Sequence, residues 1–424
     1  MQKRLNKEII SWALYDWGNS AFAVVMLTAI FPVYFKDSLS AGLDTTTGNF
    51  WWGLANSFSS IVIVLLAPVL GAIADAGGNR KKFLAVFAVL GILSTFALFF
   101  ANQGEWVFGL TLFILGSVGF MGANIFYDSM IVLVAPSDRY DFVSALGYSL
   151  GYLGGGLVMV LDVLMFMSPE KFGFSNQTQA IKAGFISVAV WWGVFTLPLL
   201  MFVKERNSKQ KISAGAALRN GLSQLANTFR EIRKLKVVML FLAAYWLYID
   251  GVDTIVRMAG IYGKSLGFDN TDLIKAILIT QFVGFPAAIA FGFIGERFGA
   301  KRGILIAIAV YIGVTIWAFR MEKVSEFYGL AIVVGLVQGG VQSLSRSFYA
   351  RIIPANKTAE FFGFYNMLGK FAAVLGPLLM GVTGLLTNDI RVSILSVIVL
   401  FIGGACLLYF VDEEQGKRMA RELE

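Results

Sequence analysis

The stretch Trp12-Ala-Leu-Tyr-Asp16-Trp-Gly-Asn19-Ser20 recurs without a gap as Trp246-Leu-Tyr-Ile-Asp250-Gly-Val-Asp253-Thr254. Tryptophan aligns with tryptophan and aspartate with aspartate, and both stretches lie in long apolar segments. An ionisable residue inside a membrane span is expensive and marks a functional site by default. Because this residue recurs at the same place in both halves, the pattern predicts a duplicated membrane transporter with its site between the halves.

Composition places most of the chain in lipid. Of 424 residues, 57% are hydrophobic and only 15% are charged, whereas soluble domains carry about 25% charged residues. A membrane-crossing helix needs about 20 apolar residues, and windows of that length occur at 10–35, 50–74, 82–101, 106–135, 142–167, 181–203, 237–263, 273–295, 301–319, 326–352, 361–386 and 392–411. None alternates like an outer-membrane strand. The predicted fold class is an all-α polytopic membrane protein with twelve transmembrane helices in two six-helix bundles.

The net charge of +8 follows membrane topology rather than a nucleic-acid surface. With the first residues placed inside, 24 of the 35 Lys and Arg residues fall on the inner side, eight on the outer side and three within spans. This excess is the positive-inside signal. It predicts that both termini are cytoplasmic and that there is no nucleic-acid partner.

Histidine is absent, and the single cysteine, Cys406, lies in the last span. Without these side chains, zinc sites, a disulfide framework and histidine acid–base chemistry are all disfavoured. We therefore expect no metal site, no cofactor and no catalytic residue.

A hydrophilic break at 204–236 divides six spans from six and carries nine basic residues. It predicts an N-terminal bundle (1–203), a cytoplasmic linker (204–236), a C-terminal bundle (237–411) and a cytoplasmic tail (412–424). Apolar linker residues recur at steps of three and four: Leu218, Leu222, Leu225, Phe229 and Ile232. This spacing predicts an amphipathic helix on the inner leaflet; a regulatory helix that binds a partner is the alternative.

The duplication extends beyond the opening pair. At an offset of 218, Asp128 aligns with Arg346 and Tyr152 with Lys370. At an offset of 221, Gly71-x-Ile-x-Asp75 aligns with Gly292-x-Ile-x-Glu296. Both halves begin on the inside, so the repeat is parallel, with its axis along the membrane normal.

The loop after the second span reads Gly71-Ala-Ile-Ala-Asp75-Ala-Gly-Gly-Asn-Arg80-Lys-Lys82. It resembles the signature between the second and third helices of the major facilitator superfamily, and a degenerate copy runs from Gly292 to Arg302. The position after Asp75 is usually basic in that signature but is Ala76 here, so an ion pair from that position is expected only in the second copy, from Arg297. The resemblance implies conformational gating by Asp75, Arg80, Glu296 and Arg297; a merely solvated loop is the alternative.

A narrower resemblance covers nearly the whole chain. The opening Ser11 to Phe22, Gly147-Tyr-x-x-Gly-Tyr-x-Gly-Gly155, Asp250-Gly-Val-Asp253 and Gln342-Ser-Leu-Ser-Arg-Ser347 are similar to signatures of the vacuolar amino-acid effluxer-like branch of that superfamily. The resemblance implies a secondary transporter, because fungal members of the branch are linked to amino-acid efflux from the vacuole. The short loops look more like those of a bacterial inner-membrane member.

Eight charged residues fall within the predicted spans: Asp16, Asp128, Asp162, Asp250, Asp253, Arg257, Arg346 and Lys370. In the implied fold, the first, fourth, seventh and tenth helices line a central cavity, with the fifth and eleventh beside them. All eight charges fall on these six helices. Asp162 lies near the outer end of the fifth, where contact with water would explain it.

Helical spacing places polar residues on shared faces that would converge on one cavity. The candidate substrate-binding or coupling residues are Asp16, Asn19, Asn124, Tyr127, Asp128, Tyr152, Asp250, Asp253, Gln342, Arg346 and Lys370. The cavity would offer both signs of charge, with acids in the first half and bases in the second. It therefore predicts a zwitterionic solute that bridges the halves.

Several of these charges have alternative partners. Asp253 and Arg257 are four residues apart and could pair within their own helix, which would leave Asp250 as the freer carboxylate. Asp128 and Arg346 could form either a static strut between the halves or a gate that opens during transport. Lys370 would bind a substrate carboxylate or a cavity aspartate, because an unpaired ammonium in the membrane is costly.

The predicted function is secondary transport of a small polar or zwitterionic, amino-acid-like solute by a monomer that rocks between two states. A proton is the candidate coupling ion, carried by a buried carboxylate such as Asp16, Asp128 or Asp250. Three alternatives stay open: a lipid or lysolipid flippase, an intramembrane aspartyl hydrolase and a sensor that does not transport.

Overall fold

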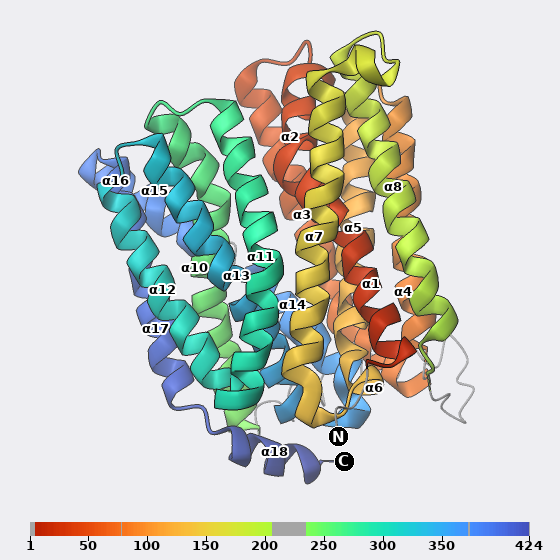
Figure 1. Ribbon diagram of the computed structural model, residues 1–424, viewed down its shortest axis with the longest axis vertical. Helices are drawn as coiled ribbons and strands as arrows, with labels where there is room; N and C mark the ends of the chain where they lie inside the picture. The colour runs from red at the N-terminus through yellow and green to blue at the C-terminus, as the bar shows by residue number, and fades with distance from the viewer. Residues whose placement is uncertain (1–4, 78, 206–234, 372–373, 424) are drawn as a thin grey trace.

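The computed structural model describes residues 5–77, 79–205, 235–371 and 374–423, and these residues form helices with no β-strand. Eleven helices are long and apolar enough to cross a membrane, and a bent pair at the start makes a twelfth span when it is counted as one. The fold class predicted from the sequence is confirmed, and the helices stand side by side along the vertical axis of Figure 1.

The first half contains α1 (Lys7–Phe22), α2 (Phe31–Tyr34), α3 (Thr45–Gly77), α4 (Arg80–Ala97), α5 (Trp106–Ser129), α6 (Ile131–Val134), α7 (Tyr140–Met167) and α8 (Gln177–Phe202). The second half contains α10 (Lys236–Ser265), α11 (Asn270–Phe298), α12 (Ala300–Arg320), α13 (Val324–Ile352), α14 (Thr358–Phe371), α15 (Leu375–Thr387), α16 (Ile390–Leu395), α17 (Ile398–Tyr409) and α18 (Glu413–Arg421). The predicted linker helix falls on residues 206–234, outside the described part of the chain.

Two spans are less regular than their apolar windows indicate. The first bends by 41° between Lys7–Ala29 and Phe31–Leu39, where a π-helical segment precedes Pro32. Both a π-bulge and a proline are recognised causes of helix kinks. The predicted window 361–386 is occupied by two helices, α14 and α15, rather than by one described run.

The two halves meet mainly where α7 packs against α11 and α13 and where α14 packs against α3 and α5. Figure 1 shows α7 beside α11 in the middle of the molecule. A Cβ atom added to Gly71 of α3 would overlap the backbone of Ala359 in α14. Glycine at this position therefore allows the close approach of the halves, as small residues do in membrane helices.

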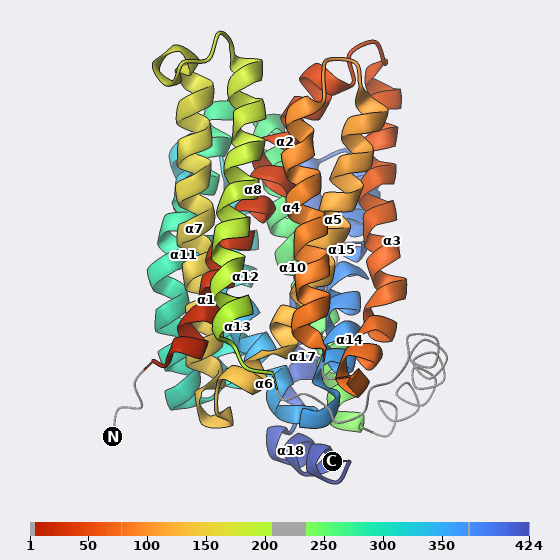
Figure 2. The ribbon, with the colours of Figure 1, turned by 90° about the vertical axis from the view of Figure 1, so that its right-hand side faces the viewer.

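The start of α1 and helix α18 lie at the same end of the molecule, at the bottom of Figure 2. We call this end the terminal side. Helix α18, which falls within the predicted tail, is attached to the second half, because Gly416 packs on Ile352 and Val237 and Glu413 lies 3.8 Å from Arg351. The outward faces of the long helices are apolar, with Leu65 and Met201 both 68% exposed, as lipid contact requires.

Candidate functional site

The guanidinium of Arg346, on α13, is buried between the halves. Arg346 is only 1% exposed. Its Nη1 lies 3.0 Å from Asp128 Oδ1 on α5, and its Nε and Nη2 donate to Ser144 Oγ and the Ser144 carbonyl, each at 2.8 Å. The predicted pairing of Asp128 with Arg346 across the halves is therefore present. Whether it acts as a strut or a gate stays a prediction.

Aromatic rings surround the same guanidinium. Its central carbon lies 4.9 Å from the Trp12 ring centroid, 5.3 Å from that of Tyr127 and 4.4 Å from that of Tyr148. Trp12 and Tyr127 stack with centroids 4.5 Å apart. Cation–π attraction strengthens when the cation is removed from water, so the rings partly replace the hydration that Arg346 has lost.

Asp16 completes this group, but its partners are more distant. Its Oδ2 accepts a 3.2 Å hydrogen bond from the Tyr127 hydroxyl and lies 3.9 Å from Arg346 Nη1. Its Oδ1 accepts only a 3.5 Å bond from Ser20. We call Arg346, Asp128, Asp16 and Ser144 the Arg346 cluster. Within it, Asp16 is the carboxylate with the weaker set of contacts.

Polar amides flank the cluster on both sides. Asn366 of α14 donates a 3.2 Å hydrogen bond to Asp128 Oδ2. Asn19 donates a 2.6 Å hydrogen bond to Asn124 Oδ1, which joins α1 to α5. The predicted residues Asn19 and Asn124 therefore bind each other within the first half.

A second group of charges lies one turn beyond Asn366. It consists of Lys370 on α14 with Asp253 and Arg257 on α10, and we call it the Lys370 cluster. Lys370 and Asp253 are partly exposed and Arg257 is exposed, and α10, which carries both Asp253 and Arg257, packs against α14. Among the described residues none of the three forms an ion pair within 4.0 Å, so the proposed pairing of Asp253 with Arg257 is not formed.

Asp250 is not the freer carboxylate that the sequence suggested. It is fully buried. Its oxygens accept hydrogen bonds from the backbone N–H groups of Leu375 at 2.9 Å and Gly376 at 2.8 Å, and from the Thr254 hydroxyl at 3.2 Å. These N–H groups begin α15, where a helix lacks internal partners and favours negative charge. Asp250 therefore caps a membrane helix.

Asp162 also differs from the expectation. It is 2% exposed rather than in contact with water. Its Oδ1 accepts a 2.7 Å bond from Ser187 of α8. Tyr152, another predicted site residue, packs its ring against the positions of Gly284 and Gly339, and its hydroxyl lies 3.5 Å from Gln342 Oε1. Tyr152 and Gln342 are therefore brought together, whereas Asp162 lies between α7 and α8.

Charged contacts join helix ends on the terminal side. Asp75 Oδ1 pairs with Arg80 Nη2 at 2.7 Å, and its Oδ2 accepts a 2.9 Å hydrogen bond from the backbone N–H of Glu360, near the start of α14. Glu205 in turn accepts from the backbone N–H groups of Arg80 and Lys81 at the start of α4. Burial raises the pKa of the Glu205 carboxyl, and these backbone donors oppose that rise.

The second copy of the motif forms its ion pair with a different partner. Glu296 pairs at 2.9 Å with Arg139, from the loop before α7. Arg297 is exposed, lies over the Phe298 ring and forms no ion pair among the described residues. The expected ion pair from Arg297 is not formed. The motif's acid, Glu296, pairs instead with Arg139, which belongs to the first half.

Sequence reasoning missed several residues of these contacts. Ser144 shares a helical face with Tyr148 and Tyr152 at steps of four, and that spacing was the available signal. Asp141, at the start of α7, pairs with Arg351 at 2.6 Å and accepts a 2.5 Å bond from Ser347. Both charges lie near predicted span ends, where a charged residue is ordinary.

Solved structures place this arrangement in a known class. The human organic anion transporter MFSD10 has a TM-score of 0.71 at 13% identity, covering 96% of this chain and 100% of its own. The proton:xylose symporter XylE has a TM-score of 0.70 at 15% identity, covering 98% and 97% respectively. The fold is that of the major facilitator superfamily.

Sequence relatives define the family. The model described as "Vacuole effluxer Atg22 like" matches residues 40–421. The MFS-type transporter YxiO of Bacillus subtilis (strain 168) is 37% identical over 100% of this chain and 99% of its own length. Autophagy-related protein 22 of Pyricularia oryzae is 22% identical over 97% of this chain and 77% of its own. The chain belongs to the Atg22-like vacuole effluxer family.

This membership has direct functional consequences. The chain is a polytopic membrane protein and a secondary transporter of a small-molecule solute, and it is not an enzyme. The intramembrane hydrolase considered from the buried aspartates is thereby set aside.

Proposed function

We propose that this protein transports a zwitterionic, amino-acid-like solute by rocker-type alternating access, and that the solute binds at the Lys370 cluster. The observation that carries the proposal is the difference between the two charged clusters. All three guanidinium nitrogens of Arg346 already donate hydrogen bonds to protein atoms, so few of its N–H groups remain to bind a solute. Lys370 and Asp253 keep part of their surface open and lack close partners among the described residues.

The chemistry of the Lys370 cluster favours a solute that carries both charges. The Lys370 ammonium offers three donors to a carboxylate, and the Asp253 carboxylate accepts from an ammonium. A solute with both groups would compensate two charges that are otherwise costly in the membrane. The amino-acid efflux implied for the fungal branch agrees with this chemistry.

We expect the substitution Lys370→Gln to raise the KM for the transported amino acid at least about tenfold, because a charge-assisted hydrogen bond contributes about 1.5–3 kcal/mol. A thermal-shift screen of amino acids, peptides, nucleosides and lysolipids would first identify the ligand. Uptake into proteoliposomes would then give the KM. Lys36→Gln, at an exposed lysine far from the cluster, is the matched control, and an equal effect of both variants would contradict the assignment.

Asp16 is our candidate for the proton-coupling acid, in place of Asp250. A coupling carboxylate must gain and lose a proton during the cycle, and Asp16 has the weaker contacts, whereas Asp250 is fixed by two backbone N–H groups. We expect Asp16→Asn to abolish the dependence of transport on a pH gradient. Asp250→Asn should lower the melting temperature but leave that dependence intact. Measuring transport against pH gradients in proteoliposomes separates the two, and the reverse pattern would overturn the choice.

The remaining organisation is proposed from the charge pattern and the contacts. The terminal side would face the cytoplasm of a bacterial inner membrane, and the protein would act as a monomer. Residues 1–203 and 237–411 would move as two bodies joined by the cytoplasmic linker. Asp75, Arg80 and Glu296 would hold the terminal side closed in the state described here, and the Arg346 cluster would separate when that side opens.

A further inference from the structure

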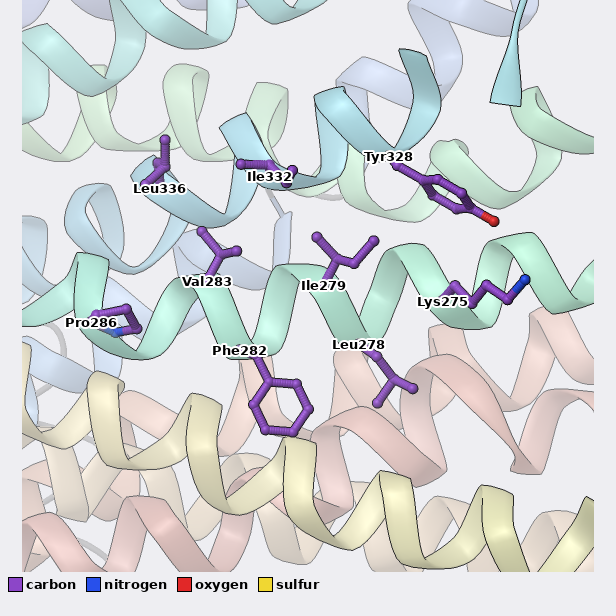
Figure 3. Close-up of a pocket in the computed structure, with 9 residues that line it drawn as sticks. All are labelled: Lys275, Leu278, Ile279, Phe282, Val283, Pro286, Tyr328, Ile332 and Leu336. Atoms are coloured by element: carbon purple, nitrogen blue, oxygen red, sulfur yellow. The ribbon is translucent and has the colours of Figure 1, made fainter. Parts of the chain in front are cut away.

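A groove of about 660 Å³ lies between α11 and α13, away from both charged clusters. Figure 3 shows its lining residues in two rows, one from each helix. Most of the lining is apolar, and includes Ile279, Phe282, Val283, Pro286, Ile332 and Leu336. Phe282, Ile332 and Leu336 are exposed at the molecular surface. The groove therefore opens toward lipid.

One end of the groove is polar. Lys275 and Tyr328 lie together at that end in Figure 3, and Pro286 and Leu336 lie at the other. Tyr328 donates a 2.6 Å hydrogen bond to Asp272 Oδ1, and Lys275 Nζ lies 3.8 Å from the same oxygen. The Lys275 side chain is 57% exposed and that of Asp272 is 19% exposed. This loose pair presents both signs of charge beside an apolar channel.

The dimensions correspond to one lipid chain. Lys275 and Pro286 are eleven residues apart on α11, which is about 16 Å along a helix. Half of a hydrocarbon core of about 30 Å is about 15 Å. Asp272 lies in the first turn of α11, so the polar end sits at the membrane interface opposite the terminal side. The groove spans one leaflet from headgroup level to midplane.

The floor of the groove is closed. Thr280 of α11 donates a 3.2 Å hydrogen bond to the Ala331 carbonyl of α13. A Cβ atom added to Gly335 would lie 3.1 Å from the Thr280 carbonyl oxygen. The two helices therefore touch beneath the groove, which makes it a surface binding site rather than an opening into the space between the halves.

We propose that this groove binds one phospholipid whose headgroup carries both a phosphate and a primary ammonium, as phosphatidylethanolamine does. One acyl chain would lie along the apolar rows. Lys275 would bind the phosphate and Asp272 the ammonium. A quaternary choline keeps its charge but has no N–H to donate to Asp272, so phosphatidylcholine loses the charge-assisted hydrogen bond. A glycerol headgroup has no cation, so phosphatidylglycerol loses the whole contact with Asp272.

The test measures bound lipid by native mass spectrometry. The full-length protein, delipidated in detergent, is mixed with dioleoyl phosphatidylethanolamine, phosphatidylcholine or phosphatidylglycerol. We expect about tenfold stronger retention of phosphatidylethanolamine, the value of one charge-assisted hydrogen bond. Asp272→Asn should remove its advantage over phosphatidylcholine, and Lys275→Ala should lower retention of all three lipids.

Two further variants keep the proposal falsifiable. Val283→Trp, which fills the channel, should lower retention of every lipid, whereas Lys264→Ala, at an exposed lysine on the same side, should change nothing. Equal retention of the three lipids in the wild-type protein would overturn the proposal and leave only non-selective boundary lipid. A dimer that disappears in Val283→Trp would overturn it in favour of a second copy of the chain. Lys275 is mostly exposed, so Lys275→Ala remains informative if Val283→Trp fails to fold.

Discussion

Replacing Arg346 with glutamine is expected to abolish transport and to destabilise the protein by about 3–5 kcal/mol, the usual effect of removing one partner from a buried ion pair. The reason is the burial of the acids that remain. Asp128 and Asp16 have side chains only 12% and 13% exposed. Without Arg346 they would be two negative charges in a low-dielectric site. Thermal unfolding in detergent and uptake into proteoliposomes measure the two effects.

The double variant Arg346→Gln, Asp128→Asn distinguishes between a static strut and a gate as the role of the ion pair. Removing both charges should recover most of the lost stability, because neutral groups carry no such desolvation penalty. If the pair is a static strut, transport will recover along with stability; if it is a gate, transport will stay low in a stable protein. Arg320→Gln, at an exposed arginine, is the control. A double variant less stable than Arg346→Gln would contradict the cluster's electrostatic account.

Replacing Asp75 with alanine is expected to open the terminal side. The substitution removes a buried pair, whose side chains are 2% exposed for Asp75 and 9% for Arg80, and it also removes the acceptor for the Glu360 N–H. Each 1.4 kcal/mol of lost closed-state stability multiplies the open population tenfold, so we expect at least about tenfold more opening. Maleimide labelling of a cysteine introduced by Ala67→Cys, in a Cys406→Ala background, reports it, because Ala67 is fully buried near Gly363 of α14.

The pseudo-symmetric substitution Glu296→Gln is the matched control. Its pair with Arg139 has side chains 25% and 28% exposed, and exposed pairs contribute only about 0–1 kcal/mol. Labelling should therefore rise less than about fivefold. Labelling that responds equally to both substitutions would show that burial does not set the strength of the terminal-side contacts.

The twelve spans and the pairing of Asp128 with Arg346 were predictable, because lipid dictates long apolar windows and leaves few places for a buried charge. The predictions for Asp250, Arg297 and Asp162 failed because each depended on contacts with other helices. Asp250 looked free because the apolar window 361–386 was predicted to be one helix, although Gly376-Pro377 is a signal that a new helix begins there and presents its N–H groups. Arg297 looked like the pairing base because sequence neighbours suggest local pairs, whereas Glu296 binds Arg139 across the halves. The burial of Asp162 depends on how α7 packs against α8, which the spacing of apolar residues along one helix does not specify.

The cap that Asp250 provides also bears on how the protein is made. The N–H groups that it binds belong to residues 125 and 126 positions later in the chain. During synthesis, α10 is therefore complete long before α15 leaves the ribosome. Until then the Asp250 carboxylate lacks its two backbone donors. The hydrogen bonds that satisfy Asp250 can therefore form only after α15 has been synthesised. Chains that stop before Leu375 would retain a buried carboxylate without these two donors in the bilayer.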